Sequence, residues 1–188
     1  TSVTTRSGAA GLAGAAFLAA GLAAGFSAAT GALTAAGAGG VTGELLFHAY
    51  MATGPFSDDM GLYRVNKAGH MTQSHVFKAP YAAMVHDFMV TRDHVIFPIM
   101  PLTGSMQRAM SGLPVYAWEP EKRNCIGIMP RNGSVADLRW FTGDATYVFH
   151  PMNAYEDGDD IVIDVARFKK LAFSPQDGEG TPAMLHRW

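Results

Sequence analysis

Short apolar runs separated by turn-forming residues dominate the chain after Glu44. The breaks between the runs carry Gly, Asn, Asp and Pro, which tight turns favour, and no helical period is sustained. Many short strands joined by tight turns predict an all-β fold: a sandwich, a barrel or propeller blades. The expected strands are 45–50, 61–65, 75–78, 83–90, 95–100, 115–118, 126–129, 138–141, 147–150 and 161–168.

Two positions carry strong turn signals between these strands. Asn132-Gly133 and Asp157-Gly158 are dipeptides that accept positive φ at little cost. A longer irregular connection spans 103–112. About a dozen strands fit two to three four-stranded blades. The chain is therefore predicted to form an incomplete ring.

The segment before Glu44 has a different composition. From Ala9 to Thr42 there is no charged residue, and Ala and Gly dominate. A signal peptide would account for this, with Arg6 as its charged region and small residues near 27–29 as a cleavage neighbourhood. A membrane span is less favoured because Ala and Gly bury little apolar surface. A flexible linker would also have this composition, as would a segment whose natural side chains have been lost or replaced. We therefore divide the chain into an Ala/Gly-rich segment, 1–43, and a β domain, 44–188.

Charge and cysteine content narrow the chemistry. The net charge is −2 and no Lys/Arg run stands out, so nothing favours a nucleic-acid partner. Cys125 is the only cysteine, which excludes a disulfide within the chain and a Cys-rich zinc site. Any metal must then be held by His and carboxylate side chains. Eleven Met and eleven Phe suit an apolar substrate tunnel, but they suit an ordinary core equally well.

Two histidines lie in apolar surroundings. Strand alternation places His86 on one face with Met84 and Phe88, where it would meet a core or a cavity. His150 ends an apolar run, and Pro151 is expected to stop the strand there. For either residue alone, a buried neutral imidazole with a backbone partner is the simpler interpretation. The two are about sixty residues apart and match no local metal motif.

The remaining polar residues give weaker signals. His48 lies in an apolar run and is expected to point inward, whereas His70, His75 and His94 lie in or beside polar turns and are interpreted as solvated. The acidic residues, Glu156 among them, are interpreted mostly as turn residues, so no carboxylate pair for hydrolysis is evident. Neither a nucleophile elbow, nor a P-loop, nor a dinucleotide fingerprint is present in the sequence.

Three stretches together resemble the carotenoid cleavage oxygenase family. Residues 79–91 are similar to its "apolar-x-HDF-x-x-T" strand, 126–131 to its "IGI-x-R" strand, and 140–158 to its "FH-x-x-NA-x-E-x-G" strand. The resemblance covers 42–168, and the spacing between the two His also fits. Residues 97–101 and 117–120 look more like the lignostilbene-dioxygenase branch.

This resemblance implies part of a seven-bladed β-propeller with Fe(II) on its axis, held by four His and supported by Glu residues around them. His86 and His150 would be two of the metal ligands. The implied reaction cleaves a C=C bond of a carotenoid, apocarotenoid or stilbenoid with O₂, which gives two carbonyl products. The implied partners are O₂ and a small apolar or phenolic alkene. We expect a cytoplasmic protein, and contact with a membrane is left open.

The sequence also departs from the family pattern. The stretch that would hold the first ligand reads Leu33–Gly40 and contains no His, and Ala9–Gly25 contains no Glu. The family pattern places the fourth His far beyond Trp188, so at most two of four ligands are expected here, and little activity is expected of this chain alone. Three hypotheses follow: a dioxygenase carried by a longer parent protein, an inactive fragment or lipophile-binding pseudo-enzyme, and an exported β protein with a cleavable leader.

Overall fold

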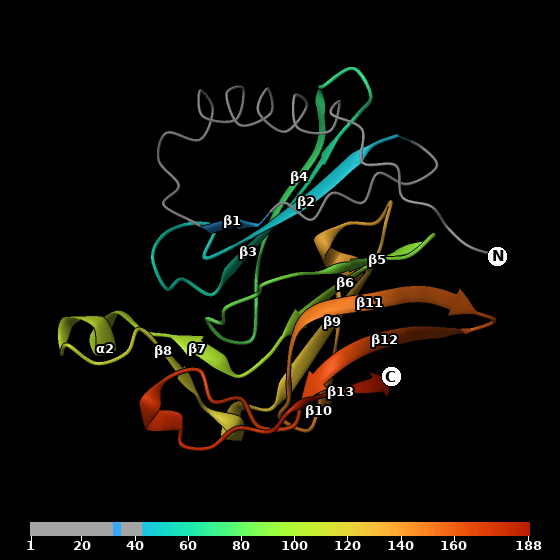
Figure 1. The fold of residues 1–188 in the computed structure, drawn as a ribbon. Coiled ribbons are helices and arrows are strands. Elements are labelled where there is room, and N and C mark those ends of the chain that lie inside the picture. Colours follow the sequence, from blue (N-terminus) through green and yellow to red (C-terminus); the bar gives the residue numbers. More distant parts are fainter. Residues whose placement is uncertain (1–31, 35–42) are drawn as a thin grey trace, which may run out of the picture.

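Antiparallel sheet makes up about half of the computed structural model, which describes residues 32–34 and 43–188 (Figure 1). The predicted all-β class is confirmed. The first sheet has the strand order β1-β2-β3-β4, and all its pairs are antiparallel. Its strands are β1 (Ala32–Thr34), β2 (Leu45–Tyr50), β3 (Asp59–Val65) and β4 (Met71–Lys78). The leader, linker and lost-side-chain interpretations fall almost wholly on 1–31 and 35–42, outside the described residues.

Two further sheets follow along the chain. The second has the order β10-β9-β6-β5 and the third β11-β12-β13. Their strands are β5 (Met89–Val90), β6 (His94–Ile99), β9 (Asn124–Pro130), β10 (Arg139–Gly143), β11 (Tyr147–Asp157), β12 (Asp160–Phe168) and β13 (Ala183–Arg187). The sheets follow one another through the molecule, from β2–β4 through β6 to β11–β12 (Figure 1). Such a succession is what blades of a propeller would give, and the number of blades stays a prediction.

An excursion separates β6 from β9. It contains the ribbon of β7 (Leu102–Gly104) and β8 (Tyr116–Trp118), with the short helix α2 (Met106–Met110) between them. Ser105 caps α2, since its side chain accepts a hydrogen bond from the Arg108 N–H. The sequence predicted an irregular connection here. In Figure 1 the excursion projects to one side of the sheets.

Strand β6 shows how the sequence builds the core. Val95, Phe97 and Ile99 face a cluster shared with the first sheet, whereas Ile96 faces a second cluster shared with the third sheet. All four are fully buried. Successive side chains of a strand point to opposite faces, so a continuous apolar run gives a strand that is covered on both sides. Strand β6 therefore contributes to both core clusters, one with the first sheet and one with the third.

Two predicted strands differ most from the structure in their bounds. The strand expected at 83–90 is reduced to Met89–Val90, preceded by a single bridge between Ala83 and Thr103. The strand expected to stop before Pro151 continues to Asp157. The proline is tolerated because the pairing with β12 is irregular there, with register shifts on both sides of Pro151. Among the described residues, no helix is long and apolar enough to span a membrane.

Candidate metal centre

The segment that carries His86 is held by the β7 ribbon. The Met84 N–H donates to the Leu102 carbonyl at 2.9 Å, and the Gly104 N–H donates to the Ala82 carbonyl at 3.2 Å. Beyond Met84 the backbone is irregular, and Val85 and Phe88 are both buried. His86 is turned outward instead and is exposed. The expectation that His86 shares an inward face with Phe88 is therefore wrong, because 84–88 does not follow strand alternation.

His150 lies where β11 departs from regular pairing. Val148 pairs with Arg167, but Pro151 pairs with Val165, so β11 has one residue more than β12 across this interval. An extra residue of this kind is a β-bulge, which bends the strand and redirects a side chain. The His150 side chain is exposed. The bulge therefore presents His150 at a position that a regular buried strand would not offer.

The two imidazoles meet in space. The ring centroids of His86 and His150 are 4.9 Å apart, and the ring planes make an angle of 76°. Two imidazoles bound at a right angle to one ion, each about 2.1 Å from it, would have centroids roughly 4.6 Å apart. The observed separation therefore fits two ligands of a single metal ion. If His86 and His150 bind one metal ion, their rings must lie this close together.

The donor set near the pair is incomplete. Over residues 32–34 and 43–188, no group of three or more His, Cys, Asp or Glu side chains could hold a metal ion. Two neutral imidazoles suit Fe(II) and other first-row metals, and their exposure leaves space for further ligands. The residues present fit half of a four-imidazole ligand set.

Aromatic rings flank the imidazole pair. Phe149 contacts His86 edge-on with a centroid distance of 5.6 Å and lies 6.5 Å from His150. It also packs against Tyr147 at 4.7 Å and Phe168 at 5.8 Å. The pair therefore has an apolar aromatic wall on the side of β11 and β12.

His48 is inward, as predicted. It is fully buried on β2, with its ring 4.8 Å from that of Phe88. Burial, with a smaller contribution from the charge of His86, lowers the pKa of His48 to about 4. At neutral pH the ring is therefore uncharged.

His94 is not a solvated turn residue. It begins β6, and its Nδ1 lies 3.2 Å from Oε1 of Glu156 on β11. Burial opposes ionisation of Glu156, but hydrogen bonds led by that from the Thr91 hydroxyl lower the pKa of its carboxyl to about 2. Glu156 is thus a charged residue joining two sheets. The sequence marked it as part of a turn, and its "NA-x-E" context was the one signal that could have singled it out.

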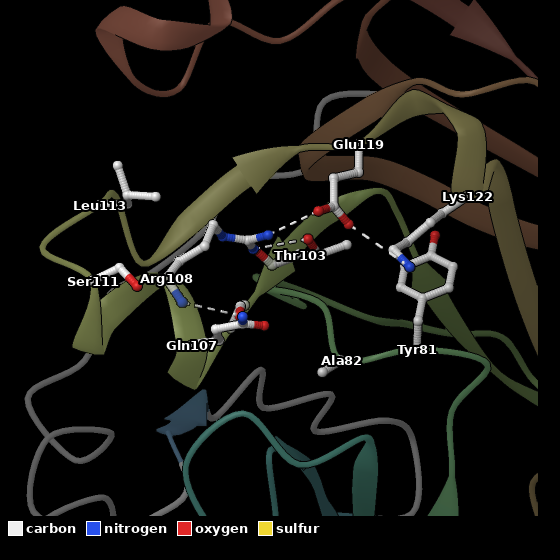
Figure 2. Close-up of a pocket in the computed structure, with 11 residues that line it drawn as sticks. Tyr81, Ala82, Thr103, Gln107, Arg108, Ser111, Leu113, Glu119 and Lys122 are labelled. Atoms are coloured by element: carbon white, nitrogen blue, oxygen red, sulfur yellow. Dashed lines mark hydrogen bonds and ion pairs between the residues drawn. The ribbon is translucent and has the colours of Figure 1, made fainter.

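A separate cavity lies against the β7–α2–β8 excursion, and Figure 2 shows its lining. Its volume is about 500 Å³. Arg108 crosses it, with Nη1 2.8 Å from a carboxylate oxygen of Glu119 and Nη2 bonded to Thr103 (Figure 2). Neither His86 nor His150 lines this cavity.

The family model described as retinal pigment epithelial membrane protein, RPE65, matches residues 31–188. The chain belongs to this carotenoid oxygenase family. The predicted resemblance is confirmed, and the match extends beyond both ends of the stretch on which it was based.

Relatives of the chain carry oxygenase names. It is 43% identical over 141 residues to isoeugenol monooxygenase of Pseudomonas putida, covering 75% of this chain and 30% of the relative. It is 31% identical over 159 residues to lignostilbene-α,β-dioxygenase isozyme III of Sphingomonas paucimobilis, covering 79% and 32%. The chain thus spans roughly a third of the length of these curated relatives.

Solved structures support the same fold. The crystal structure of Pseudomonas brassicacearum lignostilbene dioxygenase superposes with a TM-score of 0.72 at 32% identity, over 78% of this chain and 32% of that one. Cobalt-substituted Synechocystis ACO superposes with a TM-score of 0.65 at 22% identity, over 77% and 32%, which supports the fold alone.

Proposed function

We propose that the full-length polypeptide carrying this chain is a non-haem Fe(II) oxygenase that cleaves a C=C bond. His86 and His150 would supply two of the metal ligands. The observation that carries the proposal is the 4.9 Å separation of the two imidazoles, which come from distant motifs of an oxygenase family. Relatives named for isoeugenol and lignostilbene favour a phenolic alkene as substrate over a carotenoid or apocarotenoid.

The reaction balances without an external reductant. The alkene bond breaks and each of its carbons gains one oxygen atom of O₂, which gives two carbonyl products. Bound iron would supply the activation of O₂. Neutral imidazoles suit this role because they leave the positive charge of the metal intact. Phe149 and its aromatic neighbours would hold the apolar part of a planar substrate beside the two ligands and exclude water there.

The test is to substitute each ligand in the full-length polypeptide. His86→Ala and His150→Ala are expected to lose bound iron, O₂ uptake and aldehyde formation from a stilbene or isoeugenol. His70→Ala is the matched control, because His70 is exposed in a turn. The hydrogen bonds described for His70 join its backbone N–H and carbonyl to Asn66, so the imidazole can be removed without breaking them. Iron retained with full turnover in His86→Ala would refute the ligand assignment.

One observation favours a second candidate function. The described residues bring only two imidazoles together, and two such ligands hold Fe(II) weakly. An inactive pseudo-enzyme that binds a lipophilic molecule against the aromatic wall would show saturable binding of a stilbene without iron. Stoichiometric iron in the purified full-length protein would exclude it.

A further inference from the structure

Two cross-links join β11 to the chain around His86: one reaches Met84, before His86, and the other reaches the turn at 91–93, after it. We propose that Glu156 and Tyr147 are positioning residues that set the separation of His86 and His150 through these cross-links. The inference rests on the proposed function, since it concerns the same pair of ligands. It assigns a role to two side chains that do not themselves contact the metal.

The Glu156 link holds the turn between β5 and β6. Oε1 of Glu156 accepts hydrogen bonds from the Thr91 hydroxyl and from the Asp93 N–H, the latter at 3.0 Å. Oε2 accepts from the Arg92 N–H at 3.3 Å. The Glu156 side chain is only 12% exposed and Thr91 is buried, so water competes little for the bond from the Thr91 hydroxyl, whereas Arg92 and Asp93 are exposed. One carboxylate therefore fixes the turn that follows the His86 segment.

The Tyr147 link holds the chain just before His86. The Tyr147 hydroxyl donates to the Met84 carbonyl at 3.1 Å. Tyr147 is 1% exposed, so its ring is fixed by packing. Met84 lies two residues before His86, and Tyr147 lies three residues before His150. This hydrogen bond therefore couples the chain just before one imidazole to the chain just before the other.

The imidazole pair needs such links because neither ring is held by a regular ladder. His86 lies in an irregular segment, and His150 lies in a bulge. A bulge leaves residues unpaired and a strand locally free to bend. Residues that hydrogen-bond directly to metal ligands commonly change metal affinity by ten- to a hundredfold when substituted, and links that act through the backbone are expected at the lower end of that range.

Glu156→Gln is the sharpest substitution because it keeps the size of the side chain. Every backbone partner of Glu156 is a donor, so an amide must direct its NH₂ group toward either Arg92 N–H or the Thr91 and Asp93 donors. Glu179→Gln is the matched control, since Glu179 is exposed. Tyr147→Phe is a second variant that removes only the hydroxyl and keeps the buried ring.

The experiment uses the full-length polypeptide, stripped of metal and titrated with Co(II), whose visible absorption reports ligand geometry. Glu156→Gln and Tyr147→Phe are expected to weaken Co(II) binding on the order of tenfold and to change the shape of the spectrum. Glu179→Gln is expected to match the parent protein in both. Thermal unfolding of the metal-free variants is measured in parallel.

The outcomes separate the inference from the proposed function. If the parent protein binds Co(II) and His86→Ala does not, but Glu156→Gln and Tyr147→Phe keep the parent spectrum and affinity, the positioning role is wrong and the proposed function stands. A lowered unfolding temperature with an unchanged spectrum also overturns the positioning role, because it shows a purely structural one. If His86→Ala binds Co(II) as the parent does, the proposed function itself fails.

Discussion

Acidification from about pH 7 to about pH 4 is expected to destabilise the fold through His48. His48 belongs to β2, and its ring is fully buried against Phe88. Burial is the main cause that lowers the pKa of His48 to about 4. In the unfolded chain the same group titrates at its ordinary pKa of 6.5. Between these two values the unfolded state binds the proton more readily than the folded state.

The sign and size of this change in unfolding free energy follow from the linkage between proton binding and folding. The stability that depends on neutral His48 is fully present above pH 6.5 and is lost as the pH falls toward about 4, below which no further loss occurs. At about 1.4 kcal/mol per pH unit, the difference between the two pKa values corresponds to roughly 3 kcal/mol of unfolding free energy. His48 is fully buried, so solvent screening reduces this figure little.

Urea unfolding of the metal-free full-length polypeptide at a series of pH values measures this effect. His48→Leu cannot be protonated, so the free energy of the parent minus that of the variant should fall by roughly 3 kcal/mol between pH 7 and pH 4. His70→Asn, at an exposed turn, is the control and should leave the pH dependence of the parent unchanged. A difference between parent and His48→Leu that is constant with pH would refute the reasoning.

Two further substitutions test the core and a turn. Phe97→Ala should cost about 3–5 kcal/mol of unfolding free energy, because Phe97 is fully buried at the centre of the core, whereas Phe141→Ala, 53% exposed, should cost far less. Equal urea midpoints for the unfolding of Phe97→Ala and Phe141→Ala would contradict this expectation. Gly158→Ala should cost about 1–2 kcal/mol because Gly158 has a φ of 64° in the two-residue turn between β11 and β12. Gly143→Ala, where an added Cβ meets nothing within 4 Å, should cost less, and the reverse order in thermal unfolding would contradict the turn argument.

Strand positions were predictable where local pattern and burial agree. Strand β2 has the predicted bounds 45–50, and β12 begins one residue before the predicted 161–168. β2 is a short apolar run and β12 a longer, mostly apolar one. β13 was missed, because Ala183–Arg187 is mostly exposed and pairs with β12 across a long connection. Its strand character comes from its partner and not from its own sequence.

The candidate site was predictable only in part. His86 and His150 were singled out by their motifs, but nothing in the sequence spacing brings their rings to 4.9 Å. The role of Glu156 was missed for a related reason. The turn after Glu156 was recognised correctly at Gly158. The groups that donate hydrogen bonds to Glu156, however, lie more than sixty residues earlier in the chain. A partner at that separation leaves no periodic signal.

The backbone is irregular at both histidines, and one physical argument accounts for both. In a sheet covered on both faces, a regular strand directs every side chain into a packed core, as β6 does with Phe97 and Ile96. An imidazole in such a position would be packed in the core and could not act as the proposed metal ligand. The backbone therefore departs from the strand at His86 and forms a bulge at His150. Where the backbone hydrogen bonds of strand pairing are missing, side-chain hydrogen bonds between the sheets can hold the chain instead. Glu156 and Tyr147 form such hydrogen bonds.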